Sequence, residues 1–383
     1  MDVRLGELKR ALPGGLLAFG GVVLLSFADG GFFPSAWRAA AVAFFCAAAL
    51  AFVLRGRVAL TRSQALVIGA LVALTAWTAL SALWSPEPAD STLEAQRTLA
   101  YVALVLAAAA AAGSLLTGVL AGIGVVCAYA LGQRLLAGPP DPPDPFEGTL
   151  LQEPLGYANG LGGLAAIGLV IAISQLVSSR RLRLLHGALA CVFLTTLYLS
   201  GSRGGWLAAV VGAAVALALG SGRPRLARSL GATAALALAV ALARPAGSLV
   251  DELAARGGDR PWYWNVAWEE VADAPLVGKG AGTYDLAWLE RQPIPRPALD
   301  AHSLYLEFLS ELGLVGLVLL GLALTPPLLV AFRAADAAAA GGYVAFLFHA
   351  GLDWDWELPA VTVAGFLCGA ALLARERASS GIP

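Results

Sequence analysis

A histidine stands at the point where a polar stretch of the sequence gives way to a long apolar one. His302 is followed by Glu307 and Glu311, and the residues from Leu312 to Phe332 are almost all apolar. Imidazole titrates near neutral pH and can take a proton from a hydroxyl group. A base at the mouth of a membrane helix suits chemistry on a substrate that is carried by a lipid. Because a carboxylate is costly in lipid, we predict that Glu307 turns into the protein, toward Arg203 or water.

Three arginines could hold an anion near that histidine. Arg203 precedes two glycines, which let a substrate approach the backbone closely. Arg260 lies in a long polar connection, and Arg97 stands near the start of an apolar segment. The guanidinium group is a planar fork that matches phosphate oxygens. The alternative for each is a flank or loop arginine that only meets water, as Arg203 could do beside Trp206.

Other polar motifs carry weaker signals. We interpret the acidic and aromatic cluster at 353–357 as a solvated turn; the alternatives are an acid/base pair and a site that binds a cation or sugar hydroxyls. The glycine-rich stretch 278–282 follows no predicted strand, so we expect a flexible turn and no nucleotide site. The four cysteines all lie in apolar segments and show no metal-ligand spacing. No metal and no cofactor are therefore expected.

The composition indicates an integral membrane protein. The chain is 58% hydrophobic and 13% charged, with a mean hydropathy of +0.75. Most of its apolar segments are long enough to cross about 30 Å of hydrocarbon. We predict an all-α polytopic protein, with residues 1–383 forming a single integral membrane domain. The predicted spans are 12–27, 37–54, 64–84, 98–112, 115–136, 157–177, 184–200, 204–220, 227–243, 303–331, 340–352 and 357–374.

The distribution of arginine gives an orientation. Twelve spans place both termini on one side of the membrane, and short connections on that side carry basic clusters at 55–62, 180–183 and 223–228. Short basic loops favour the cytoplasm. We therefore predict that both termini are cytoplasmic. The proline-rich connection 138–156 is predicted to be a stiff, extended segment on the outer side.

The connection 244–301, between the ninth and tenth spans, is too long for a passive link. Pro261 suits the first turn of a helix, Trp264 and Trp268 follow at helical spacing, and Pro275 ends the pattern. This pattern predicts a large periplasmic or extracellular loop that contains an amphipathic helix, which would lie on the membrane surface or against the spans.

Taken in order along the chain, these motifs resemble the O-antigen ligase/polymerase family of bacterial membrane glycosyltransferases. The resemblance covers about residues 155–330 by motif and the whole chain by topology. The family often has Asn after the histidine, where this chain has Ser303. The motifs are Tyr157-Ala-Asn159-Gly, Ser202-Arg203-Gly204-Gly205-Trp206, Arg260-Pro-Trp-Tyr-Trp264, Pro275-Leu-Val-Gly278-Lys-Gly280 and His302-Ser-Leu-Tyr305-Leu-Glu307.

The resemblance implies a GT-C-like fold and a metal-independent reaction at the outer side of the bacterial inner (plasma) membrane. A glycan would pass from an undecaprenyl-pyrophosphate carrier to an acceptor hydroxyl on a glycan, a lipid or a wall polymer, among membrane lipids and without nucleic acid. His302 would orient or deprotonate the acceptor, and Arg203 and Arg260 would bind the leaving pyrophosphate. Further candidates for binding the lipid-linked glycan are Arg97, Ser202, Tyr157, Asn159, Tyr305 and Glu307.

Two other classes of protein stay open. A transporter or flippase of lipid-linked glycan would also use outer arginines, but it would be expected to place charge deeper in the membrane, where the predicted spans have almost none. A peptidoglycan polymerase of the shape-and-division type fits the order of arginines, loop and histidine less well. The sequence does not separate a ligase from a polymerase, because both use the same donor.

Overall fold

The computed structural model describes residues 2–55, 58–111, 114–178, 181–242, 258–334 and 336–379, and within these it is all-helical. Twelve helices match the twelve predicted spans one to one. Nine of the described helices, which are all of these twelve except α1, α9 and α14, are long and apolar enough to cross a membrane, and the apolar parts of α1 and α14 are shorter. The predicted polytopic α-helical fold is confirmed. The twelve are α1 (Asp2–Ser26), α2 (Pro34–Arg55), α3 (Arg62–Ser81), α4 (Pro88–Ala111), α5 (Leu115–Ala137), α6 (Ala158–Ser178), α7 (Arg183–Ser200), α8 (Arg203–Gly220), α9 (Pro224–Leu242), α13 (Leu304–Ala334), α14 (Ala337–Ala350) and α15 (Pro359–Ser379).

Small residues let the central helices approach one another closely. α6 is the most deeply buried span, and it packs against α7, α8 and α14. A Cβ added to Gly212 of α8 would lie 2.6 Å from the carbonyl oxygen of Gly341 in α14, which is closer than real Cβ contacts. Such small-residue contacts are typical of membrane helix interfaces. They fix α14, and with it the turn that follows, against the start of α8.

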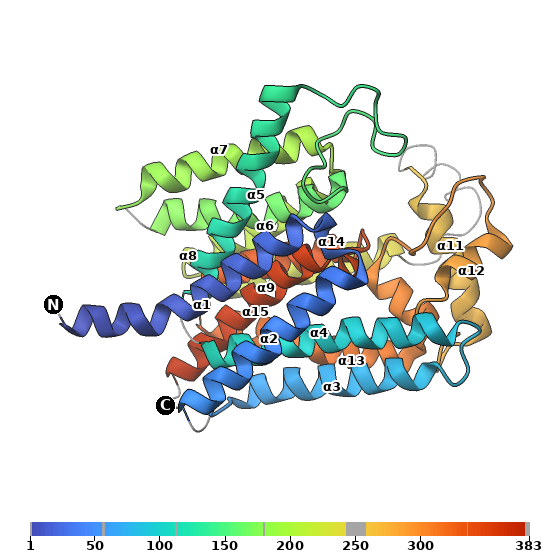
Figure 1. The fold of residues 1–383 in the computed structure, drawn as a ribbon, viewed down its shortest axis with the longest axis horizontal. Coiled ribbons are helices and arrows are strands. Elements are labelled where there is room, and N and C mark those ends of the chain that lie inside the picture. Colours follow the sequence, from blue (N-terminus) through green and yellow to red (C-terminus); the bar gives the residue numbers. More distant parts are fainter. Residues whose placement is uncertain are drawn as a thin grey trace.

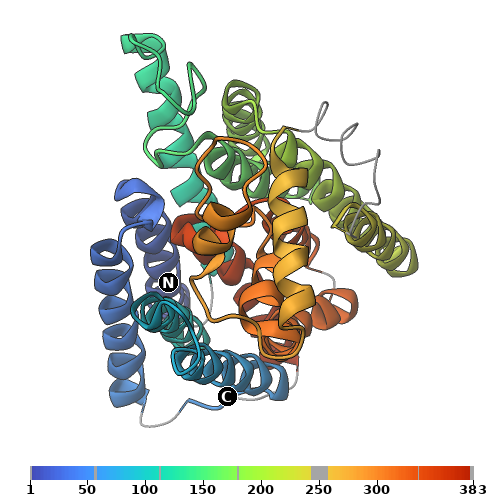
Figure 2. The same ribbon diagram turned by 90° about the vertical axis from the view of Figure 1, so that its right-hand side faces the viewer.

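The helices of the long connection between α9 and α13 lie together at one end of the molecule. α11 (Arg260–Asp273) and α12 (Tyr284–Arg291) lie at the right-hand end in Figure 1, opposite the start of α1 and the end of α15. Figure 2 looks onto this end, where α11 crosses the face of the bundle. The predicted amphipathic helix is confirmed: Pro261 stands in its first turn, and its buried residues pack against α12 and α13. Residues 244–257 lie outside the described residues.

The glycine-rich segment after α11 is packed into a break in α13. Gly313 interrupts α13 with a φ of +67°, and a Cβ there would lie 2.3 Å from backbone atoms of Leu276. The amide of Leu314 donates to the carbonyl of Pro275 at 2.9 Å, and the amide of Gly280 donates to that of Glu311 at 2.8 Å. The prediction of a flexible turn at 278–282 was therefore wrong, because its glycines provide close contact with α13.

Candidate functional site

A cavity of about 940 Å³ opens beside the start of α11, at the end of the bundle that carries α11 and α12. Four of the predicted site residues line it: Tyr157, Asn159, Arg260 and His302. The other lining residues come from the connection between α1 and α2, the segment 144–156, the start of α11, the segment 296–300 and the turn after α14. They are Phe32, Asp144, Pro145, Phe146, Glu147, Gln152, Gly156, Asp259, Tyr263, Arg296, Pro297, Ala298, Leu299, Asp300 and Trp354.

The segment 138–156 forms one wall of this cavity. The backbones of Asp144 and Gly148 exchange two hydrogen bonds of 2.9 and 3.0 Å, and the Asp144 carboxylate accepts the amides of Phe146 and Glu147 at 2.8 Å each. The segment thus closes a tight turn over the site. The prediction of one extended connector did not include this turn, because the aspartate that closes it stands among prolines that read as a stiff chain.

Asp353 joins two of the predicted residues at the base of the cavity. Its carboxylate accepts a hydrogen bond from Arg260 Nη2 at 2.7 Å and another from the Tyr157 hydroxyl at 2.7 Å, and the amide of Asn159 donates to that hydroxyl at 3.1 Å. Arg260 Nε also donates to the carbonyl of Leu352 at 2.7 Å. The guanidinium plane is therefore held by two separate acceptors, and its remaining donors can face a ligand in the cavity.

The charge states of this network follow from burial and pairing. Asp353 is only 1% exposed, and burial raises its pKa, but Arg260, the two histidines His302 and His349 and the Tyr157 hydrogen bond together lower the pKa below its usual value. Burial, together with Asp353, raises the pKa of Tyr157 well above 10, so the phenol keeps its proton and acts as a donor. Around neutral pH the network is an ion pair with one neutral phenol.

The prediction of a solvated turn at 353–357 was wrong. Asp353, Asp355 and Trp356 are each 1% exposed. The Asp355 carboxylate pairs with His349 Nδ1 at 2.7 Å, and the carbonyl of Trp356 accepts a hydrogen bond from Tyr101. Asp353 and Glu357 pair with arginines from distant parts of the chain, and Asp355 pairs with a histidine six residues earlier, so each buried acidic group of the turn has a partner that offsets the cost of its burial.

His302 is held in an uncommon backbone conformation. Its φ of +51° lies in the left-handed region, which costs free energy in a residue with a Cβ and is found where the surroundings enforce it. The imidazole packs against Tyr263, with ring centroids 4.7 Å apart. Its Nδ1 lies 3.0 Å from the carbonyl oxygen of Asp300. Because a carbonyl can only accept, Nδ1 carries the proton of the neutral ring, and the lone pair is on Nε2.

The pH profile of activity is expected to report this histidine. Burial lowers the pKa of His302 below 6.5, outweighing Asp353, which raises it. The imidazole is therefore neutral at pH 7 and becomes protonated, and inactive as a base, only in more acidic solution. We expect the acid limb of kcat/KM to have its midpoint below pH 6.5 and to be absent from the residual activity of His302→Gln. A midpoint above 6.5 would contradict this assignment.

Arg203 begins α8 beside the entry to α11. It is exposed, and a Cβ added to Gly258 would lie 3.8 Å from its Nη2 atom. Gly258 is two residues from Arg260, so the structure brings the segments that carry the two predicted pyrophosphate-binding arginines together. The hydroxyl of Ser202 accepts the amide of Gly205 at 3.0 Å and caps α8. Ser202 thus fixes the position of Arg203 rather than facing the cavity.

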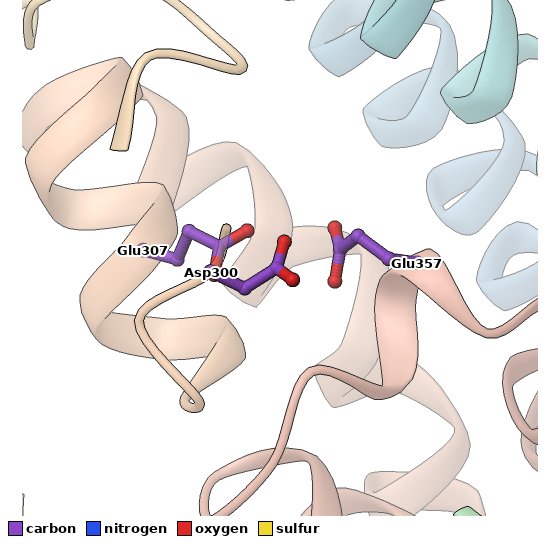
Figure 3. A group of neighbouring side chains, drawn as sticks. All are labelled: Asp300, Glu307 and Glu357. Atoms are coloured by element: carbon purple, nitrogen blue, oxygen red, sulfur yellow. The ribbon is translucent and has the colours of Figure 1, made fainter. Parts of the chain in front are cut away.

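Arg97 and Glu307 lie in a smaller cavity that shares Asp300 with the first. Arg97 contacts Glu94 at 2.9 Å and Glu357 at 3.4 Å. The carboxylates of Asp300, Glu307 and Glu357 point toward one another from three different elements (Figure 3), with oxygens within 4.8 Å. This trio is close enough to share one cation, and Arg97 already supplies a positive charge beside Glu357.

The carboxylate cluster holds protons at neutral pH. Burial raises the pKa of Asp300 to about 7, although Arg97 opposes the shift. Burial, followed by the neighbouring Asp300, also raises the pKa of Glu357 well above its usual value. Three carboxylates near a single arginine cannot all be ionised without strong repulsion. Protonation removes this repulsion, so the three carboxyl groups can lie close together behind the backbone segment that carries His302.

Two glutamates of α13 anchor the backbone segments at 282–284 and 301 by accepting hydrogen bonds from their amides. Glu307, 6% exposed, accepts the amide of Ala301 at 2.9 Å, next to His302. Glu311 accepts the amides of Gly282, Thr283 and Tyr284 at 2.8, 2.9 and 3.0 Å. The prediction that Glu307 turns into the protein is confirmed, but its partner is the backbone before His302 and not Arg203.

Substitution of Glu307 separates anchoring from contact with a substrate. Glu307→Gln keeps an oxygen that can accept the Ala301 amide, whereas Glu307→Leu leaves this buried donor unsatisfied, at a cost of about 1–3 kcal/mol. We expect Gln to retain most of the activity and Leu to lower kcat more than tenfold. Equal and complete loss in both variants, at equal protein level, would mean that the charge of Glu307 acts on the substrate.

Tyr305 makes a contact between two helices. Its hydroxyl donates to the carbonyl of Leu347 at 2.8 Å, so it joins α13 to α14 and is not among the residues that line the large cavity. The residues that the sequence analysis did not select are Asp353, Trp354, Asp300 and Glu357. The first, second and fourth belong to the acidic and aromatic cluster at 353–357, whose density of polar residues between two spans was the available signal.

Comparison with known proteins bears on the same part of the chain. Among curated proteins none matches this sequence. The model of the O-antigen ligase family matches residues 187–321, from α7 into α13, which is the part of the chain that carries Arg203, Arg260 and His302.

Proposed function

We propose that this protein transfers a glycan from an undecaprenyl-pyrophosphate carrier to an acceptor hydroxyl. The observation that carries the proposal is one cavity lined both by an arginine, which Asp353 holds in place, and by a histidine whose Nε2 lone pair is free of the backbone hydrogen bond. The family match to residues 187–321 supports O-antigen ligase or polymerase chemistry.

The reaction depends less on proton transfer to a base than on positive charge that stabilises the leaving group. The acceptor oxygen forms a bond to the anomeric carbon of the donor sugar, and the bond from that carbon to the pyrophosphate oxygen breaks. The acceptor proton passes to His302 Nε2, and the electron pair of the broken bond stays on the pyrophosphate. Arg260, with Arg203 beside it, stabilises the negative charge that develops there. Two guanidinium groups supply this charge without a metal ion.

The histidine adds a smaller factor. A positioned base contributes typically about 10²–10⁴-fold to such a transfer. The hydrogen bond from Nδ1 to Asp300 fixes the tautomer, and the contact with Tyr263 fixes the ring plane. Both constraints act before the acceptor arrives, so the base does not have to be ordered during the reaction.

The cavity is proposed to face the outer side of the bacterial inner membrane, with both termini cytoplasmic. A cysteine in place of Leu289, which is 63% exposed on α12, is expected to react with an impermeant maleimide in intact cells after the native cysteines are replaced. The control is a cysteine at Arg223, which lies on the basic side between α8 and α9. Labelling of the Arg223 position in intact cells, and of Leu289 only after permeabilisation, would reverse the proposed orientation.

Reconstitution tests the function itself. Purified protein in liposomes, given lipid-linked oligosaccharide and an acceptor glycolipid in excess chelator, is expected to form a covalent transfer product. Movement of intact donor across the bilayer without a transfer product would support the transporter instead. Product that forms only when Mg²⁺ or Mn²⁺ is restored would contradict metal independence.

A further inference from the structure

Trp354 lines the cavity and contacts other aromatic rings. Its ring centroid lies 4.6 Å from that of Tyr157 and 5.7 Å from that of Phe32, which stands nearly perpendicular to it at 82°. The imidazole of His302 lies 6.4 Å away. The indole is half-buried, so it is held firmly while part of its surface faces the cavity.

Other outer tryptophans serve the fold. Trp264 donates its indole N–H to the carbonyl of His302, Trp268 donates to that of Leu242, and Trp288 donates to that of Arg296. They pack in the core beneath α11 and α12. None of these three lines the large cavity, whereas Trp354 does. The position of Trp354 therefore needs a reason beyond the packing of the outer segment.

The cavity is larger and more varied than a pyrophosphate requires. Pockets of roughly 300–1,000 Å³ hold whole drug-sized molecules. Besides Arg260 and His302, the residues that line this cavity include Gln152 and Asn159, which have side-chain amides, and Glu147, which has a carboxyl group. A sugar ring offers matching chemistry, because its C–H face is apolar and its rim carries hydroxyl groups that donate and accept hydrogen bonds.

We propose that Trp354 is the stacking platform for a pyranose ring next to the reacting atoms, with Glu147, Gln152 and Asn159 as partners for its hydroxyls. The inference rests on the proposed function, since it names where the glycan of that reaction binds. A ring stacked on Trp354 lies beside His302, so it is either the first sugar of the donor or the acceptor sugar whose hydroxyl loses its proton. Kinetics distinguishes these two possibilities.

Three variants separate stacking from packing. Trp354→Tyr keeps an aromatic face, and Trp354→Leu keeps apolar volume without one. The matched control is Trp84→Leu, because Trp84 is 37% exposed, contacts Trp77 and is not among the residues that line either cavity. We expect Trp354→Leu to raise KM for one substrate about tenfold with a smaller change in kcat, Trp354→Tyr to stay within about threefold of wild type, and Trp84→Leu to match wild type.

A rise in KM for the donor would place the donor sugar on Trp354, and a rise for the acceptor would place the acceptor sugar there. Wild-type KM values for both substrates in Trp354→Leu would overturn the proposal. If the wild type transfers nothing, binding of carrier-free oligosaccharide, released from the lipid-linked pool by mild acid, is followed by saturation-transfer NMR. Loss of that binding in Trp354→Leu but not in Trp84→Leu would support the platform without the proposed reaction. Equal binding by all variants would refute it.

Discussion

Replacing His302 by alanine is expected to abolish glycan transfer while binding of the lipid-linked donor survives. Arg260 keeps both of its protein acceptors in this variant, so the electrostatic anchor for pyrophosphate is unchanged. The loss should reach the roughly 10²–10⁴-fold that a positioned base contributes. Transfer is measured with purified donor and acceptor in proteoliposomes, and donor binding is measured separately on the detergent-solubilised protein.

The variant His302→Gln then distinguishes proton uptake by the histidine from orientation of the acceptor hydroxyl. Glutamine can donate to or accept from the acceptor hydroxyl, but it cannot take its proton at neutral pH. Substantial turnover in this variant would mean that orientation of the hydroxyl suffices, because pyrophosphate is already a good leaving group. Wild-type transfer by His302→Ala would exclude the histidine from the reaction.

Replacing Arg260 by lysine is expected to lower kcat/KM for the donor about a hundredfold or more, although the charge is kept. The guanidinium group donates to Leu352 and Asp353 at 2.7 Å each and has donors left for the substrate. An ammonium group cannot satisfy both acceptors and present a planar fork to phosphate oxygens. It would also leave the buried carboxylate of Asp353 partly unpaired.

The control for this variant is Arg291→Lys. Arg291 of α12 pairs with Glu270 and Asp273 of α11 at 2.8 and 2.9 Å. It is not among the residues that line the two cavities. Its replacement is expected to leave transfer within about twofold of wild type, since pairs of this kind contribute about 0–1 kcal/mol. Full activity of Arg260→Lys, with normal donor KM, would show that a bidentate contact to pyrophosphate is not made there.

The spans and the outer amphipathic helix could be predicted because their signals are local. A long apolar segment predicts a helix whatever that helix packs against. Pro261 and Pro275 mark the two ends of α11 without information from the rest of the chain. His302 and Arg260 could be selected for a similar reason. His302 stands where a polar stretch gives way to an apolar one, and Arg260 lies in a short motif that resembles one of the family.

The partners themselves could not be predicted from the sequence. Asp353 contacts Arg260 and Tyr157, which are 93 and 196 residues away, so its burial depends on how α6, α11 and the turn after α14 meet. The carboxylate of Glu307 was expected near Arg203 because charge suggested a cation, yet a backbone amide six residues earlier satisfies it. Composition marked the turn at 353–357 as polar, and only the fold shows that it is buried.

The most direct measurement follows both products of one turnover in proteoliposomes that contain the wild-type protein. The account predicts one equivalent of undecaprenyl pyrophosphate released for each glycan attached to the acceptor, in the presence of chelator, with neither product formed by His302→Ala. Release of the carrier without a glycosylated acceptor, or movement of intact donor across the bilayer with no release, would contradict it.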